Sequence, residues 1–305
     1  MHFTHIINPF VAPAGSPHAL AQPITFAALR RAIADAAAQD IRVEVLAPVF
    51  PDDEPAVEAP AKALPLLTRT VSDVVPLSAP APFPLCQDVL QIGADHGSGE
   101  YVVFTNMDIC PQPYLYRALA AMIAGQPDRA FVIPRRTIAA RFTDPSQLSE
   151  MLAEPGVPHE GFDCFVFPRK WVSKFDLGNL CLGIPSWDLA LILNLDVVTG
   201  FKLKVLWNQF LTFHLGDDKD WKTRRELLDH NDAEFTACAH RLREHVGRIP
   251  ARSKFEYAQV WVTGCSKPPA PAWMRILRRL EQSAAEWRNR WMVRQFRREL
   301  GVPSW

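Results

Sequence analysis

Two polar residues separated by one position follow an apolar run in the first half of the chain. They are Asn106 and Asp108, just after Tyr101-Val102-Val103-Phe104. Side chains two apart in an extended chain point the same way, so both can offer oxygens to one divalent cation, Mg2+ or Mn2+, that bridges a diphosphate. The alternative, of about equal weight, is that both residues only form a turn and cap a helix.

A second polar run lies far along the chain, at 213–221. His214 ends an apolar stretch, and Gly216, Lys219 and Trp221 follow it. The imidazole of His214 could bind a metal and the ammonium group of Lys219 a phosphate. A lone histidine is more often structural, but these neighbours favour the metal-binding interpretation.

Asp188 follows a rigid turn that contains Gly183 and Pro185. Its carboxylate could accept a proton from an acceptor hydroxyl, and the ring of Trp187 could form one wall of a sugar site. Asp188 could equally be the first-turn acid of a helix over 189–195.

Two further clusters are candidates for substrate contacts. His159, Glu160 and Asp163 precede an apolar strand, which suits acceptor binding or an ordinary loop. Arg135 and Arg136 follow the strand expected at 130–134, where paired guanidinium groups could clamp phosphates. A solvated basic turn explains the two arginines equally well.

The elements that must position these residues alternate between strand and helix. Strands are expected at 3–7, 41–49, 69–76, 101–104 and 130–134, helices at 25–39, 84–96 and 112–124, and a surface loop at 50–65. This β-α-β order predicts an α/β fold with a Rossmann-like, mainly parallel sheet covered by helices. Ligands bind beyond the carboxyl ends of such strands, which is where Asn106 and Asp108 stand.

Three regions are expected along the chain. Residues 1–140 form a nucleotide-binding α/β half, 141–266 an acceptor-side half of the same domain, and 267–305 a Pro-rich linker with a basic amphipathic helix. That helix, at 273–300, could contact an anionic membrane surface. The slightly favoured alternative is that its tryptophan stripe docks on the main domain or on a partner.

The composition is that of an ordinary globular protein. The 305 residues carry a formal net charge of zero, and 48% are hydrophobic. Nothing in the pattern favours nucleic-acid binding. The first residues lack the features of a signal peptide, and no run approaches the ~20 apolar residues of a membrane span. The expected location is therefore the cytoplasm, peripheral to the inner face of the membrane if the C-terminal helix binds lipid.

In order and spacing, residues 1–225 resemble the GT-A class of nucleotide-sugar-dependent glycosyltransferases. Thr105-Asn106-Met107-Asp108-Ile109 is similar to the D-x-D metal motif of that class, with Asn106 in place of the first aspartate. Asp188 resembles the base of inverting members. His214, Gly216, Lys219 and Trp221 are similar to a shortened His-Gly-Lys-Trp ending of a retaining group, so the stereochemical outcome stays open.

The resemblance implies transfer of a sugar from a nucleotide-diphosphate donor to a hydroxyl of a glycan or lipid-linked acceptor. Asn106, Asp108 and His214 would hold Mg2+ or Mn2+, Lys219 would contact the diphosphate, and Asn8 and Asp73 would lie near the nucleotide. One alternative is a sugar-1-phosphate nucleotidyltransferase, although Asn8-Pro9-Phe10 is not the Gly-rich basic loop that such an enzyme needs. The other is a carbohydrate- or partner-binding protein without turnover.

Overall fold

The computed structural model describes residues 1–207, 209–216 and 220–246, without the side chains of Glu160, Asp220 and Trp221. The chain separates into a unit of Met1–Val262 and a unit of Thr263–Trp305. The linker and amphipathic helix expected at 267–305 lie outside the described residues, as does Lys219. The description that follows concerns the first unit only.

The described strands form a single sheet. Their bounds are β1 His2–Ile6, β2 Arg42–Pro48, β3 Ala61–Leu64, β4 Tyr101–Thr105, β5 Cys110–Pro111, β6 Phe131–Ile138, β7 Val157–Pro168, β8 Lys204–Val205 and β9 Thr212–Leu215. The order is β3-β2-β1-β4-β7-β6-β9-β5, and β8 pairs with β6. The first four strands are parallel, whereas β7 is antiparallel to both β4 and β6.

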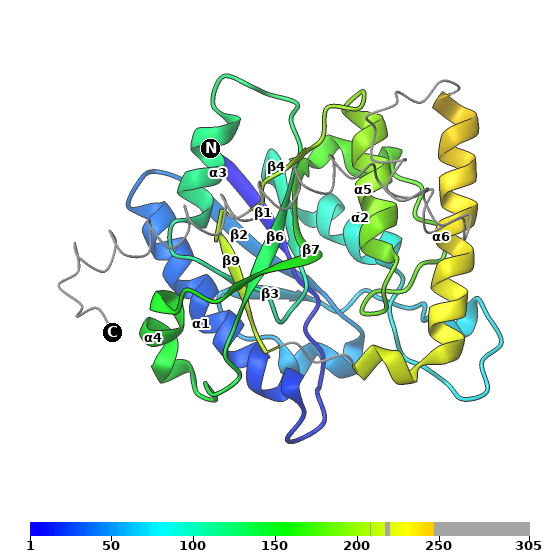
Figure 1. Cartoon of the computed structure of the whole chain (residues 1–305), viewed down its shortest axis with the longest axis horizontal. Coiled ribbons are helices and arrows are strands. Elements are labelled where there is room, and N and C mark those ends of the chain that lie inside the picture. The colour runs from blue at the N-terminus through cyan, green and yellow to red at the C-terminus, as the bar shows by residue number, and fades with distance from the viewer. Residues whose placement is uncertain (208, 217–219, 247–305) are drawn as a thin grey trace, which may run out of the picture. The chain divides into compact units, whose positions relative to one another are not determined.

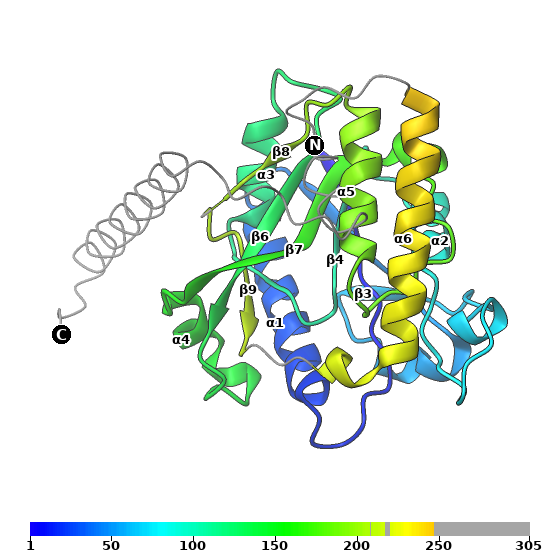
Figure 2. The same cartoon turned by 45° about the vertical axis from the view of Figure 1, so that its right-hand side comes forward.

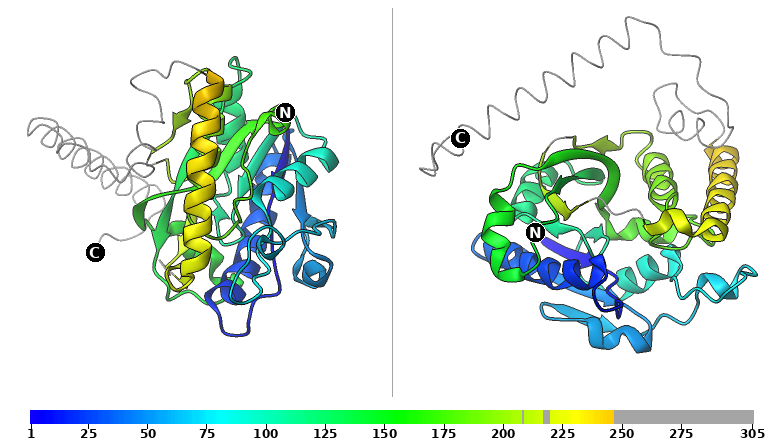
Figure 3. Two further views of the ribbon diagram at one scale, coloured as in Figure 1. Left: turned by 90° about the vertical axis from the view of Figure 1, so that its right-hand side faces the viewer. Right: turned by 60° about the horizontal axis from the view of Figure 1, so that its bottom comes forward.

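Helices cover both faces of this sheet. They are α1 Pro17–Ala37, α2 Cys86–His96, α3 Leu115–Ile123, α4 Leu148–Ala153, α5 Trp187–Val198 and α6 Arg225–Val246, with short 3-10 helices at Pro51–Ala56, Val71–Asp73, Pro145–Gln147, Arg169–Lys174 and Asp220–Thr223. α1 and α3 lie on one face, and α2 and α5 on the other (Figure 1). α6 runs alongside α5 on the outside of that second layer (Figures 2 and 3).

The position of β4 between two helical layers explains why Tyr101-Val102-Val103-Phe104 is an uninterrupted apolar run. Successive side chains of a strand point to opposite faces, and here both faces are covered. Val102 and Phe104 pack into the core beneath α2 and α5, whereas Tyr101 and Val103 pack into the core beneath α1 and α3. All five residues of β4 are buried, so the strand forms a rigid base for the residues that follow it.

The predicted α/β class, with a mainly parallel sheet between helical layers, is confirmed. The strand expected at 69–76 is wrong. Thr70 and Asp73 cap each other there around the 3-10 turn Val71–Asp73, and this local hydrogen bonding competes with strand pairing. None of the described helices is long and apolar enough to cross a membrane.

The surface loop expected at 50–65 is wrong in part, because it contains β3. Ala61–Leu64 is too short for a pattern of alternation, and it becomes a strand by pairing in parallel with β2 from Val45 to Pro48. α1 also begins at Pro17, well before the expected start at Thr25. Ser16 caps it by accepting a hydrogen bond from the backbone N–H of Ala19 at 3.2 Å, and Pro17 suits the first turn.

We expect Phe104→Ala to lower the free energy of unfolding by about 3–5 kcal/mol, because it removes a fully buried ring that packs against Phe165 and Trp187. Val11→Ala is the control, since Val11 is 58% exposed, and it should change the free energy by less than about 0.5 kcal/mol. Urea unfolding of both variants measures the difference. A loss of under about 1 kcal/mol for Phe104→Ala would contradict this account of the core.

Candidate functional site

The register of the sheet brings residues that are distant in sequence to the carboxyl end of β4. Thr105, the last residue of β4, pairs with Cys164 of the antiparallel strand β7. Asp163 therefore lies beside the point where β4 ends and the 106–108 segment begins. The site is thus located where an open α/β sheet usually binds its ligands.

β6 brings Arg135 to the same region through an irregular stretch. The pairing of β6 with β7 shifts register around Pro134, where the proline has no N–H to donate. Such bulges redirect side chains. Nη1 of Arg135 donates to Oδ1 of Asp163 at 2.9 Å, and Nη2 lies 3.5 Å from Nε2 of His159.

Arg136, the neighbour of Arg135, has different partners. Its Nη2 donates to the carbonyl oxygen of Leu152 at 3.0 Å, and its guanidinium lies over the rings of Phe210 and Phe213. Burial lowers the pKa of Arg136. Arg136 is therefore held at the end of α4, whereas Arg135 contacts Asp163, so the two guanidinium groups have separate partners.

Asp108 and His214 come into direct contact, although 105 positions separate them in the sequence. β9 pairs with β6, with His214 opposite Thr137, and this places Nε2 of His214 at 3.1 Å from Oδ2 of Asp108. Nδ1 of the same ring lies 2.8 Å from the carbonyl oxygen of Gly216. The proximity expected for these two residues is present.

The contact shifts the pKa values of Asp108 and His214 in opposite directions. Burial acts to raise the pKa of Asp108, but the hydrogen bond and charge of His214, aided by His18 and Arg135, outweigh it and lower this pKa to about 2. Burial acts to lower the pKa of His214, and the hydrogen bond and charge of Asp108 outweigh it, so the pKa rises. Asp108 is therefore ionised near neutral pH.

His18, which was not among the residues predicted from the sequence, also lies near Asp108. It stands in the first turn of α1, with Nε2 at 3.9 Å from Oδ2 of Asp108 and its ring against Phe10. The missing step was the helix start, because Ser16-Pro17 is a recognisable cap and first position. That start would have placed His18 at a positively polarised helix end.

Asp163 and Asp188 complete a chain of interacting carboxylates. Burial raises the pKa of Asp163, and the charge of Asp108 adds to this effect while Arg135 opposes it. Burial, and then the charge of Asp163, raises the pKa of Asp188 to about 7, against hydrogen bonds from backbone N–H groups of Leu189, Asp188 and Ser186. Asp188 is thus a first-turn acid of α5 and also a member of the cluster.

Trp187 does not form an open wall for an acceptor. It is 4% exposed, with its ring 5.5 Å from the rings of both Phe104 and Phe165, so it belongs to the core. Trp207 is an aromatic residue that reaches the surface near Arg135 and His159; it is 45% exposed and packs against Phe162. It lines a shallow hollow together with Pro134, Arg135, Arg136, Pro158, His159 and Phe210.

The remaining predicted residues lie as follows. Asn106 is half-buried just past β4, and Nδ2 of Asn8 donates to the carbonyl oxygen of Pro48 at 2.7 Å, between β1 and β2. Asp73 accepts hydrogen bonds from the N–H and hydroxyl of Thr70, so its carboxylate serves a local cap. Glu160 lies in β7, and its side chain is outside the description.

The side chains that could bind a divalent cation are of suitable types, but they are few. Within the described residues no group of three or more His, Cys, Asp or Glu side chains is arranged to hold a metal. Oδ1 of Asp108 and Oδ2 of Asp163 are nevertheless buried without a hydrogen-bond partner in that part of the chain. Unpaired buried carboxylate oxygens are costly, and a cation near Asp108 and His214 would satisfy the first of them.

Comparison with protein-family models finds no match, nor does comparison with curated protein sequences. Among solved structures, S. aureus TarS with UDP-GlcNAc is similar at 12% identity, over 84% of this chain and 74% of that chain, with a TM-score of 0.44. Mycobacterium tuberculosis glucosyl-3-phosphoglycerate synthase with Mn2+, UDP-glucose and phosphoglyceric acid is similar at 11% identity, over 78% and 79%, with a TM-score of 0.45.

The catalytic domain of Drosophila β1,4-galactosyltransferase 7 with xylobiose is similar at 10% identity, over 75% of this chain and 82% of that chain, with a TM-score of 0.40. All three similarities are distant, with TM-scores below 0.5. The roles of the residues therefore rest on the geometry described above.

We expect the wild type to lose stability relative to Asp188→Asn as the pH rises from about 4 to about 7. A carboxyl group whose folded pKa is raised to about 7 binds its proton more tightly in the folded state, so its stabilising effect is complete below the unfolded pKa and is lost as the pH rises through the folded pKa. The change should be on the order of 2 kcal/mol after allowance for solvent screening.

Thermal unfolding of both proteins between pH 4 and pH 8 measures this difference. Asp229→Asn serves as the control, because Asp229 is an exposed carboxylate on α6. A difference between wild type and Asp188→Asn that stays constant across this pH range would show that Asp188 is not perturbed.

Proposed function

We propose that the chain transfers a sugar from a nucleotide-diphosphate donor to a hydroxyl of a glycan or lipid-linked acceptor. The supporting observation is the meeting of Asp108, Arg135, Asp163, Asp188 and His214 at the carboxyl edge of the sheet. Each comes from a different element, and together they join cation ligands, a guanidinium group and a carboxylate whose pKa is about 7. Clustered, perturbed titratable groups are typical of reaction centres.

On the donor side, Asp108 and His214, with Asn106, would hold Mg2+ or Mn2+. The cation would supply positive charge to the diphosphate as it departs. Arg135 adds a guanidinium group next to this position, at 2.9 Å from Asp163. Asn8, Asp73 and Lys219 remain proposed donor contacts, and of these Asn8 is held beside the end of β1 by its bond to Pro48.

On the acceptor side, Asp188 would remove the proton of the attacking hydroxyl. A base works best when its pKa is near the working pH, and burial together with Asp163 provides that value. His159, Glu160 and Asp163 remain the proposed acceptor contacts, whereas Trp187, which was also expected to contact the acceptor, packs in the core against Phe104 and Phe165. The shallow hollow lined by Trp207 also contains His159. The exposed aromatic ring of Trp207 would suit the apolar face of an acceptor sugar.

A binding test examines the donor site directly. We expect UDP, UDP-glucose or UDP-GlcNAc, among a panel of nucleoside diphosphates and nucleotide-sugars, to raise the melting temperature of the wild type in the presence of Mn2+. Ligand at about 100 times its Kd stabilises by about 2.7 kcal/mol. Asp108→Ala should lose most of this shift because it removes the carboxylate that contacts His214.

Asp229→Ala should keep the shift and is the matched control, since its carboxylate lies on the surface of α6. If no nucleotide in the panel shifts the wild type, or if Asp108→Ala responds as the wild type does, the proposed donor site is wrong.

The pH dependence of turnover tests the role of Asp188. We expect the transfer rate to rise as the pH increases through about 7, where Asp188 loses its proton. Asp188→Asn should retain nucleotide binding but lose about 100-fold or more in kcat. The measurement is product formation at saturating donor from pH 5.5 to pH 8.5. A pH-independent rate, or near-normal kcat in Asp188→Asn, would remove this residue from the reaction.

A second candidate function is carbohydrate or partner binding without turnover. The observation that favours it is the small number of possible metal ligands, since no group of three metal-binding side chains is present in the described residues. Metal-dependent nucleotide binding without hydrolysis or transfer of the donor sugar would establish this alternative.

A further inference from the structure

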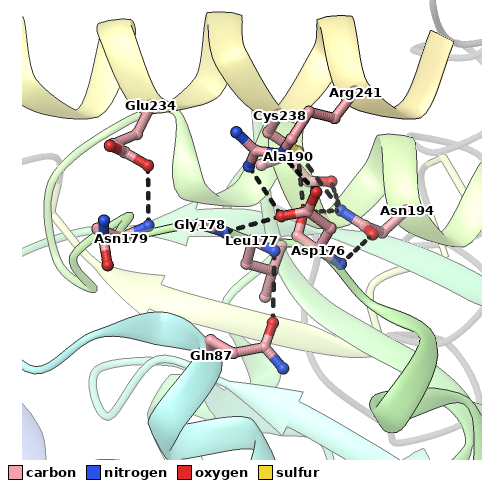
Figure 4. Close-up of polar contacts among 10 residues, drawn as sticks. All are labelled: Gln87, Asp176, Leu177, Gly178, Asn179, Ala190, Asn194, Glu234, Cys238 and Arg241. Atoms are coloured by element: carbon pink, nitrogen blue, oxygen red, sulfur yellow. Dashed lines mark hydrogen bonds and ion pairs between the residues drawn. The ribbon is translucent and has the colours of Figure 1, made fainter. Parts of the chain in front are cut away.

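The loop that leads to Asp188 is held along its length by one face of α6. Nε and Nη2 of Arg241 donate to the two carboxylate oxygens of Asp176, at 2.6 and 2.8 Å, and the backbone N–H of Asn179 donates to Glu234 at 2.9 Å. Figure 4 shows these contacts between the helix and the loop. Asp176 thus meets the C-terminal part of α6, and Asn179 meets a residue nearer its start.

The contacts with the next part of the loop come from Asn231. Asn231 is a polar residue in the otherwise mostly apolar stripe by which α6 packs, and it is fully buried. Its Oδ1 accepts from the backbone N–H of Cys181 at 3.0 Å. Its Nδ2 donates to the carbonyl oxygens of Cys181, Ile184 and Pro185, at 3.0, 2.9 and 3.0 Å.

Asp232, the next residue of α6, holds the end of the same loop. The hydroxyl of Ser186 donates to Oδ1 of Asp232 at 2.7 Å. Ser186 precedes α5 with φ of 83° and ψ of −18°, a left-handed conformation that costs a non-glycine residue about 1–2 kcal/mol. Such a conformation persists only where surrounding contacts impose it, and here Asn231 holds the residues just before Ser186 while Asp232 holds Ser186 itself.

We propose that Asn231 and Asp232 are positioning residues that fix the left-handed turn at Ser186 and thereby hold Asp188 in place in the first turn of α5. This inference rests on the proposed function for the role of Asp188 in transfer. The geometric part stands independently of that function, because it concerns the contacts that hold the turn at Ser186.

The environment of Asp188 is the property that this arrangement sets. Burial and the charge of Asp163, on β7, raise its pKa, and backbone N–H groups of the turn oppose the increase. Burial, and then the charges of Cys181 and Asp188, raise the pKa of the Cys86 thiol at the start of α2, and Asp232 accepts the hydrogen bond of the Ser186 hydroxyl. A relaxed turn would expose Asp188 and remove it from Asp163, so its pKa would fall toward the ordinary value.

The test compares three variants, each with and without Asp188→Asn. Asp232→Ala removes the acceptor of the Ser186 hydroxyl. Asp232→Asn removes the charge and keeps an acceptor oxygen. Arg241→Met breaks the far end of the same interface, at Asp176, and controls for general destabilisation. The pH dependence of thermal unfolding within each pair reports the pKa of Asp188 without any substrate.

We expect Asp232→Ala to lower the pKa of Asp188 by about one unit or more, while Asp232→Asn and Arg241→Met leave it close to that of the wild type. The inference is overturned if Asp232→Ala leaves this pKa unchanged, or if Arg241→Met shifts it as much. Where Asp232→Ala does not fold, Asn231→Ser, which shortens the side chain, takes its place with the same expectation.

Turnover provides the second measurement. Asp232→Ala should reduce kcat by about tenfold with the KM for the donor unchanged, and Asp232→Asn should restore most of the lost activity. If the wild type transfers no sugar, the proposed function fails while the unfolding experiment still decides the inference. A fall in kcat that Asp232→Asn does not rescue would count against positioning through Ser186.

Discussion

Carboxylates gathered at one poorly solvated edge of the sheet are the constraint around which this structure is arranged. Asp163 interacts by charge with both Asp108 and Asp188, and like charges at short range oppose joint ionisation. Removing such groups from water is costly unless each gains a partner or keeps its proton. The structure uses both solutions, because His214 and Arg135 supply positive charge while Asp188 is easily protonated.

The topology of the sheet delivers these partners. Parallel pairing alone places the ends of β1 and β4 side by side, with Ile6 opposite Phe104. The insertion of β7 antiparallel to both β4 and β6 adds side chains that approach the same edge from the opposite direction. Asp163 and Arg135 come from this antiparallel pair, and β9 then brings His214 alongside β6.

The sequence predicted the elements best where the pattern was long and local. β4 was expected because Tyr101-Val102-Val103-Phe104 has no polar interruption, and the approach of His214 to Asp108 followed from a resemblance in motif order. Thr70 and Asp73 form a cap where a strand was expected, because apolar content alone does not reveal local side-chain hydrogen bonds. Trp187 looked suited to a sugar, and only tertiary packing shows that Phe104 and Phe165 enclose it.

Other features had no local signal at all. β3 is a strand because it pairs with β2, and the proximity of His18 to Asp108 depends on where α1 begins. The role of Asn231 was equally hidden, since a single polar residue in an amphipathic helix gives no indication of the loop that it holds. Contacts between distant segments decide such cases.

The division of protonation states across the cluster follows from these positions. Asp108, in contact with His214, has a pKa of about 2 and carries its charge at any physiological pH. Asp188, next to Asp163 and the backbone of a strained turn, has a pKa of about 7 and can exchange a proton there. Two carboxylates whose environments separate their pKa values in this way can serve as a permanent anion and as a proton acceptor within one site. The fold achieves this separation because His214 lowers the pKa of Asp108, whereas burial and the charge of Asp163 raise the pKa of Asp188.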